Sequence, residues 1–182
     1  GQQVPSPWFL YLAYNAPHTP IQPPADWLRK VTERQSGINP KRAALVALIE
    51  HMDAGIGQVI QTLRETKQYQ RTVIIFTSDN GGALPHGANN DPLAGGKQEM
   101  LEGGLRVPCV ARWPGQIRPG RESDEPLAFW DFMPTLAELA GIDPPTPIDG
   151  VSFVPTLLDS GEQEHHRYLF FGSSDKKKRC YV

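Results

Sequence analysis

Residues 72–82, TVIIFTSDNGG, join an apolar run to an acid, an amide and two glycines. The apolar part predicts a buried strand over 72–77, and Asp79 and Asn80 follow where that strand runs out. Asp, Asn and Gly are common turn residues, so a turn or a helix cap is an open alternative for this pair. In open α/β sheets, however, ligands bind beyond the carboxyl ends of the strands. The pair therefore has two readings that the rest of the chain must separate.

A long amphipathic helix is predicted before this strand, over residues 40–66. Asn39 is a good N-cap, and Pro40 suits the first helical position. Apolar residues recur with the i, i+3, i+4, i+7 spacing of a helix that is covered on one face. Gly55 and Gly57 interrupt the helix, and we expect close packing against another backbone at both.

The remaining elements complete an α/β pattern. The segment WFLYLAY, residues 8–14, predicts another buried strand. The order strand, helix, strand is typical of an α/β sheet with right-handed crossovers. We also expect short helices over 25–34 and within SFVPTLLD, a helix over 131–140, and strands over 107–113 and 165–171. Cys109 lies in one of these strands and is expected to be a small core residue.

Charge and hydropathy exclude some partners. The net charge of −2 gives no electrostatic case for nucleic acid. No apolar stretch approaches the roughly 20 residues of a membrane span. With two cysteines in 182 residues, neither a disulfide framework nor a zinc site is expected.

Two loops place polar side chains after predicted strands. If strands 8–14 and 72–77 are parallel, the loops NAPHTP and SDNGG put His18 and the Asp79–Asn80 pair on one edge of the sheet. The oxygens of Asp79 and Asn80 suit calcium or magnesium. His18 stands between two prolines, and Lys97 follows the AGG of a long glycine-rich loop. On position alone, a structural His18 and a solvated Lys97 are the favoured readings.

Five segments, in order, carry a resemblance to the sulfatase family. They are PWFLYLAYNAPHTPIQPP, ALIEHMDAGIGQVIQTL, TVIIFTSDNGG, LAGGKQEMLEGGLRVPCVARWPGQI and FWDFMPTLAELAGI, and they span roughly residues 7–160. The sequence is most similar in style to arylsulfatases and N-acetylgalactosamine-6-sulfatases. The resemblance implies part of an alkaline-phosphatase-like sandwich, with a mixed, mostly parallel sheet flanked by helices.

The resemblance also implies roles for individual residues. Asp79 and Asn80 match family ligands of an active-site calcium, or magnesium in some relatives. His18 matches a histidine that binds the sulfate and helps to protonate the leaving oxygen. Lys97 matches a lysine that contacts a sulfate oxygen and assists the leaving group.

Weaker substrate-binding candidates lie in the loop that varies within the family: His86, Asn89 and Asn90. The implied substrate is a sulfate ester, aryl or carbohydrate. Sulfate ester cleavage requires charge stabilisation on the sulfate oxygens and a proton for the departing oxygen.

The sequence departs from the family at the nucleophile. Sulfatases use a formylglycine made from the Cys or Ser of a C/S-x-P-x-R motif, and neither Cys109 nor Cys180 lies in one. We therefore expect a fragment that lacks an N-terminal half and is inactive alone, with residues 1–160 from the catalytic domain and 161–182 opening a further subdomain. We expect its exposed apolar surface to favour self-association. The resemblance implies a periplasmic or secreted parent.

Two other functions remain open at this stage. A phosphodiesterase or phosphonate hydrolase of the same superfamily would use a similar metal site. A non-catalytic domain that binds anions is the third reading, and it would bind its ligand without turnover.

Overall fold

The computed structural model describes residues 6–172 and the backbone of 179–181. The chain divides into two compact units, one of residues 12–110 and the other of residues 1–11 with 111–182. The division falls within strand β2 (Cys109–Arg112). The subdomain boundary expected at residue 160 stays a prediction.

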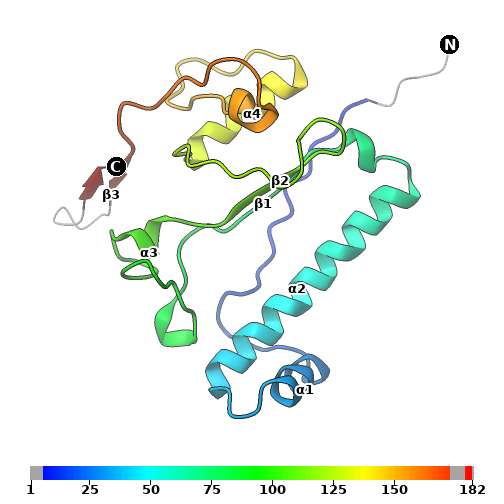
Figure 1. Cartoon of the computed structure of the whole chain (residues 1–182), viewed down its shortest axis with the longest axis vertical. Coiled ribbons are helices and arrows are strands. Elements are labelled where there is room, and N and C mark those ends of the chain that lie inside the picture. Colours follow the sequence, from blue (N-terminus) through cyan, green and yellow to red (C-terminus); the bar gives the residue numbers. More distant parts are fainter. Residues whose placement is uncertain (1–5, 173–178, 182) are drawn as a thin grey trace. The chain divides into compact units, whose positions relative to one another are not determined.

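Two helices form the core of the unit 12–110. Helix α1 (Ala25–Arg34) packs against the longer α2 (Pro40–Glu65), as Figure 1 shows. Both confirm the sequence prediction, and the Asn39 side chain caps α2 by accepting from the backbone N–H of its second and third residues. Val31 of α1 is buried against Ala43 and Ala47 of α2. Small residues at these two positions of α2 let α1 approach closely.

The rest of α2 is partly covered. An added Cβ at Gly55 would lie 3.0 Å from the Tyr14 hydroxyl, so this glycine does pack closely, although against a side chain. The same expectation is wrong at Gly57, where a Cβ would meet nothing within 4 Å. By length and mean hydropathy α2 could also cross a membrane, but core helices of soluble proteins pass the same test. In α2, 17% of this apolar window is buried within the described part of the chain.

Strand β1 (Ile74–Thr77) follows α2 after the short η1 (Tyr69–Arg71), and it pairs with β2. The α/β class is thus confirmed. Between the two strands lie η2 (Leu84–His86) and α3 (Glu102–Leu105).

The strand predicted over residues 8–14 is wrong. These residues form no strand, and Phe9 and Tyr11 are 73% and 81% exposed. A strand exists only where a neighbour completes its hydrogen-bond ladder, and no other segment of 6–172 or 179–181 does so here. The apolar composition of residues 8–14 predicted that they are buried, but burial also requires another segment that covers them.

Cys109 is likewise not the core residue that was expected. It is a free thiol in an exposed position of β2. Desolvation by nearby atoms still raises the pKa of its thiol above the ordinary value.

The second unit holds the remaining elements. After η3 (Phe129–Asp131) comes α4 (Phe132–Ala140), which confirms the predicted helix and ends at Gly141 in the left-handed conformation. Helix α5 (Val154–Leu158) also matches its prediction. Strand β3 (Phe170–Gly172) pairs antiparallel with β4 (Arg179–Tyr181), so the strand predicted over 165–171 is shorter and later than expected.

A buried carboxylate holds this unit together. Asp131 is fully buried and accepts hydrogen bonds from the backbone N–H of Ala128 at 2.7 Å and of Val151 at 2.9 Å. His166 Nε2 lies 2.8 Å from Asp131 Oδ1, and because a carboxylate accepts, the imidazole donates. The start of α4 is thereby joined to two segments that follow it in the chain.

Candidate active site

The loop after β1 presents two oxygen-bearing side chains. Asp79 is exposed and Asn80 is half-buried. Neither side chain has a hydrogen bond or an ion pair to any residue of the described chain, whereas the Ser78 hydroxyl donates to the Asn80 carbonyl at 3.0 Å. The side-chain oxygens of Asp79 and Asn80 are therefore unengaged, and their role as metal ligands stays a prediction.

Gly81 fixes the position of this loop. Its N–H donates to the Gly104 carbonyl at 3.0 Å. A Cβ at Gly81 would lie 1.8 Å from the Gly103 carbonyl oxygen, a separation that no side chain can occupy. The glycine is therefore required for the close approach of two backbones, and this approach holds the Asp79–Asn80 loop against residues 103–104.

Lys97 is attached to the same loop. Its backbone N–H donates to the Gly82 carbonyl at 3.1 Å. The side chain is half-buried, and within the described part of the chain its ammonium has no carboxylate partner. The Lys97 ammonium and the side-chain oxygens of Asp79 and Asn80 thus extend from backbone segments that are hydrogen-bonded to each other.

Asn90 acts as a clamp in this arrangement. Its Oδ1 accepts from the Gly82 N–H at 3.0 Å, while its Nδ2 donates to the carbonyls of Gly82 at 3.1 Å and Gly95 at 2.9 Å. The neighbouring Asn89 accepts from the Asp91 N–H at 3.1 Å in a local turn. Sequence reasoning missed the positioning role of Asn90, which its hydrogen bonds across the glycine-rich loop reveal. The substrate contacts expected of Asn89 and Asn90 stay predictions.

His18 lies in an exposed loop with its ring oriented by the backbone. Its Nδ1 is 2.8 Å from the Thr19 carbonyl oxygen. Because a carbonyl can only accept, Nδ1 carries the proton and Nε2 is left for another partner. In the imidazolium form, Nε2–H becomes a donor. His18 can therefore give up a proton at Nε2 while Nδ1 keeps its bond to Thr19.

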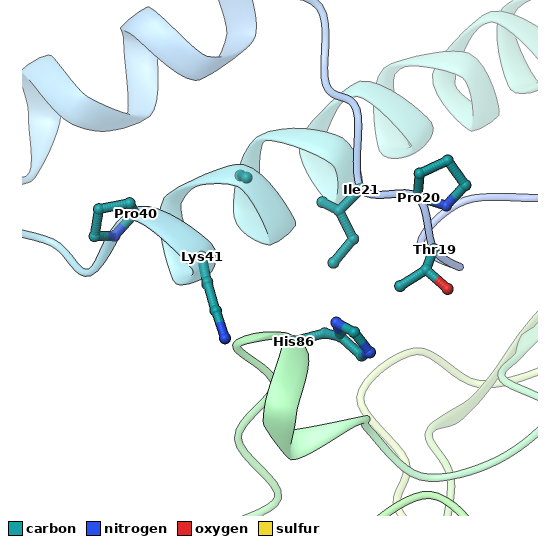
Figure 2. A pocket seen from close by; sticks show the side chains of 7 residues that line it. Thr19, Pro20, Ile21, Pro40, Lys41 and His86 are labelled. Carbon is teal, nitrogen blue, oxygen red and sulfur yellow. The ribbon is translucent and has the colours of Figure 1, made fainter.

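His86 is brought to the loop that contains His18. It is the last residue of η2, and it lines a hollow of about 480 Å³ together with Thr19, the residue after His18. Figure 2 shows the His86 ring beside Thr19 and below the start of α2. Lys41 lines the same hollow, a position that its place as the second residue of a predicted helix does not indicate.

The donors fit a divalent cation only in part. Carboxylate and amide oxygens are the ligands that calcium and magnesium prefer, and those of Asp79 and Asn80 are unengaged. Calcium takes about six to eight oxygens, however, and the described residues contain no group of three or more His, Cys, Asp or Glu that could hold a metal ion. Asp79 and Asn80 can thus supply part of a coordination shell.

Comparison with known proteins gives consistent matches. The family model described as Sulfatase matches residues 1–142. Steryl-sulfatase of Rattus norvegicus is 40% identical over 132 residues, which cover 67% of this chain and 23% of that protein. N-acetylgalactosamine-6-sulfatase of Canis lupus familiaris is 33% identical over 180 residues, covering 96% of this chain and 32% of that protein. The chain therefore spans about a quarter to a third of the length of these relatives.

Solved structures agree with the sequence matches. The crystal structure titled Ps i-CgsB in complex with k-i-k-neocarrahexaose superposes with a TM-score of 0.83 at 34% identity, covering 94% of this chain and 38% of that one. A phosphonate monoester hydrolase from Silicibacter pomeroyi matches with a TM-score of 0.57 at 26% identity, covering 80% of this chain and 31% of that one.

Proposed function

Because the chain belongs to the sulfatase family, we propose that it forms part of the active site of a sulfuric ester hydrolase. The observation that carries the proposal is the hydrogen bond from the Lys97 N–H to the Gly82 carbonyl. It joins the cationic residue to the loop of Asp79 and Asn80, so the three side chains share one backbone framework. Sulfate ester cleavage needs such a grouping, because negative charge collects on the sulfate oxygens.

Each residue takes one role in this proposal. Asp79 and Asn80 hold a calcium ion, or magnesium, through their side-chain oxygens. When bound, the cation stabilises negative charge on the sulfate oxygens. Lys97 donates to a sulfate oxygen and supports the departing group. His18 binds the sulfate and donates a proton from Nε2 to the departing oxygen, while its Nδ1–H bond to Thr19 fixes the ring.

The nucleophile is not among these residues. A formylglycine would derive from a C/S-x-P-x-R motif, which the 182-residue sequence does not contain. We therefore expect the 182-residue polypeptide to hydrolyse no sulfate ester by itself.

The names of the relatives support a proposal for the substrate class. Their names refer to steryl sulfates and to 6-sulfated N-acetylgalactosamine, and one solved structure holds a neocarrahexaose. We take the substrate to be the sulfate ester of a ring alcohol, with a sulfated sugar as the first candidate. A periplasmic or secreted location for the whole protein is part of this proposal.

Self-association belongs to the proposal as well. Trp8, Phe9, Leu10, Tyr11 and Leu12 form a continuous exposed run, from 48% to 81% exposed. Contiguous exposed apolar surface favours association. Size-exclusion chromatography with light scattering should give a mass that rises with concentration, and Phe9→Ser with Tyr11→Ser should reduce it. A concentration-independent monomer would refute this part.

A calcium titration tests the proposed site. In the ¹⁵N-labelled chain, calcium should shift the amide resonances of Asp79 and Asn80. Asp79→Ala should abolish these shifts, whereas Asp53→Ala, which removes an exposed carboxylate on α2, should leave them intact. Shifts that survive Asp79→Ala, or that appear elsewhere in the chain, would contradict the assignment of Asp79 as a ligand.

A phosphonate monoester hydrolase is the second candidate. Its support is the solved hydrolase of that class, which superposes less closely than the first structure described above, with TM-scores of 0.57 and 0.83. The two functions differ in the anion that the site prefers. Tighter binding of phenyl phosphonate than of phenyl sulfate, in the presence of calcium, would favour the second candidate.

A further inference from the structure

The hollow beside His86 has no role in the proposed chemistry. It measures about 480 Å³ and is formed by three segments of the unit 12–110. These are the loop after His18, the first turns of α2, and η2. We call it the Lys41 hollow, because Figure 2 shows the Lys41 side chain reaching from the helix start toward η2 and His86. Its position next to the His18 loop suggests a place for a substrate to extend.

The lining combines an apolar wall with basic groups. Thr19, Lys41 and His86 bring a hydroxyl, an ammonium and an imidazole, and none of the acidic residues that the structure describes lines the hollow. The other lining residues are apolar: Pro20, Ile21, Pro40 and Ala44. Ligand sites of this type use the apolar surface for contact area and a few polar groups for orientation. The Lys41 hollow therefore suits a ring that has one apolar face and carries an anionic group.

Lys41 keeps its charge available. Its Nζ donates to the Pro85 carbonyl at 3.2 Å, and Arg42 donates to the Gly87 carbonyl at 3.1 Å. These bonds fix the helix start to η2, but a carbonyl is neutral and an ammonium has three donors. Within residues 6–172, no carboxylate pairs with Lys41. An anion in the Lys41 hollow would meet a positioned, uncompensated positive charge.

The start of α2 adds to this preference. Lys41 and Pro40 lie in the first turn of a helix of 26 residues, where the helix dipole is positive. Glu50 and Asp53, the nearest acids along α2, lie more than two turns further on, and Glu50 pairs with Arg34. The described elements that form the Lys41 hollow thus present positive charge to it.

We propose that the Lys41 hollow binds the portion of the substrate beyond the scissile ester, a ring with a second anionic group that Lys41 contacts. This inference rests on the proposed function, because it places the scissile ester next to His18 and the second anion next to Lys41. The second anion is a carboxylate or another sulfate, which share the oxygen chemistry that an ammonium recognises.

The test compares probes with one and two anions. The first is N-acetylgalactosamine 6-sulfate, the second carries a further sulfate on the same sugar, and the third carries a linked uronate. Dissociation constants come from amide shifts of Thr19, Ile21 and Ala44 in the ¹⁵N-labelled chain. At least one two-anion probe should bind about tenfold more tightly than the first, as one charge-assisted hydrogen bond predicts.

Variants of Lys41 assign that difference to one side chain. Lys41→Gln should remove the preference for two anions, and Lys41→Arg should retain most of it. Lys67→Gln, which removes an exposed lysine beyond the far end of α2, is the matched control and should change nothing. If Lys41→Gln weakens binding of the disulfated probe, the second anion that Lys41 contacts is a sulfate. If it weakens binding of the probe with the uronate, the second anion is a carboxylate.

Two results would overturn the inference. One is a wild-type chain that binds all three probes equally or shows no shift at these amides. The other is a Lys41→Gln variant that keeps the preference. Failure of the proposed function is a separate outcome: the preference at Lys41 would persist, but calcium would not shift Asp79 and Asn80.

Discussion

Replacing Asp131 by alanine should strongly destabilise the unit that comprises residues 1–11 and 111–182. The change removes the carboxylate that accepts hydrogen bonds from three donors, which are two backbone N–H groups and the His166 imidazole. Each hydrogen bond to a charged group contributes about 1.5–3 kcal/mol. The contributions do not add fully, because one carboxylate serves all three and the His166 side chain is 14% exposed to water. We expect a loss of about 3–5 kcal/mol in the free energy of unfolding, as for other broken buried pairs.

Asp131→Asn separates charge from shape. The substitution keeps the side-chain volume but turns an NH₂ group toward one of the donors. The loss in the free energy of unfolding should therefore be smaller than for Asp131→Ala, about 2 kcal/mol. Urea unfolding measures both values, and amide exchange at Ala128 and Val151 should accelerate in parallel. Asp143→Ala, at an exposed aspartate after α4, is the control. A stability of Asp131→Ala within about 0.5 kcal/mol of the wild type would refute the reasoning.

Two further predictions concern the site loop and the thiol. Gly81→Ala puts a Cβ 1.8 Å from the Gly103 carbonyl oxygen, so it should displace the loop and abolish the calcium-induced shifts at Asp79. Gly57→Ala is the control and should leave these shifts intact, because a Cβ there meets nothing within 4 Å. Unchanged calcium binding in Gly81→Ala would count against a fixed loop. Desolvation raises the pKa of the Cys109 thiol, so less thiolate is present at a given pH. In a chain that carries Cys180→Ser, the pH midpoint for alkylation of Cys109 should therefore be higher in the folded state than in urea. Equal midpoints would show that folding does not desolvate the thiol.

Local signals in the sequence were sufficient for the helices. The cap at Asn39, the apolar spacing of α2 and the terminal Gly141 each act within a few residues, and α1, α2 and α4 formed as predicted. The prediction of a strand over 8–14 was wrong because a strand forms only beside a hydrogen-bonding neighbour, which composition does not specify. The prediction that Cys109 is buried was wrong for a related reason: apolar neighbours in the sequence do not ensure that another element covers the residue.

The candidate site was predictable in its residue types but not in its framework. Asp79 and Asn80 stood out because they follow a strand, and the structure leaves their oxygens unengaged. The link from Lys97 to Gly82, the hydrogen bonds of Asn90 and the Lys41 hollow all join separate turns or segments of the chain. Such contacts depend on how loops fold onto one another, which no local pattern encodes.

The measurement that tests the central claim most directly is the effect of calcium on sulfate ester binding. If Asp79, Asn80 and Lys97 form one site, calcium should tighten the binding of N-acetylgalactosamine 6-sulfate, and the sugar sulfate should tighten calcium binding by the same factor. Asp79→Ala should remove this coupling in both directions. An affinity for the sulfate ester that is the same with and without calcium in the wild-type chain would contradict the account.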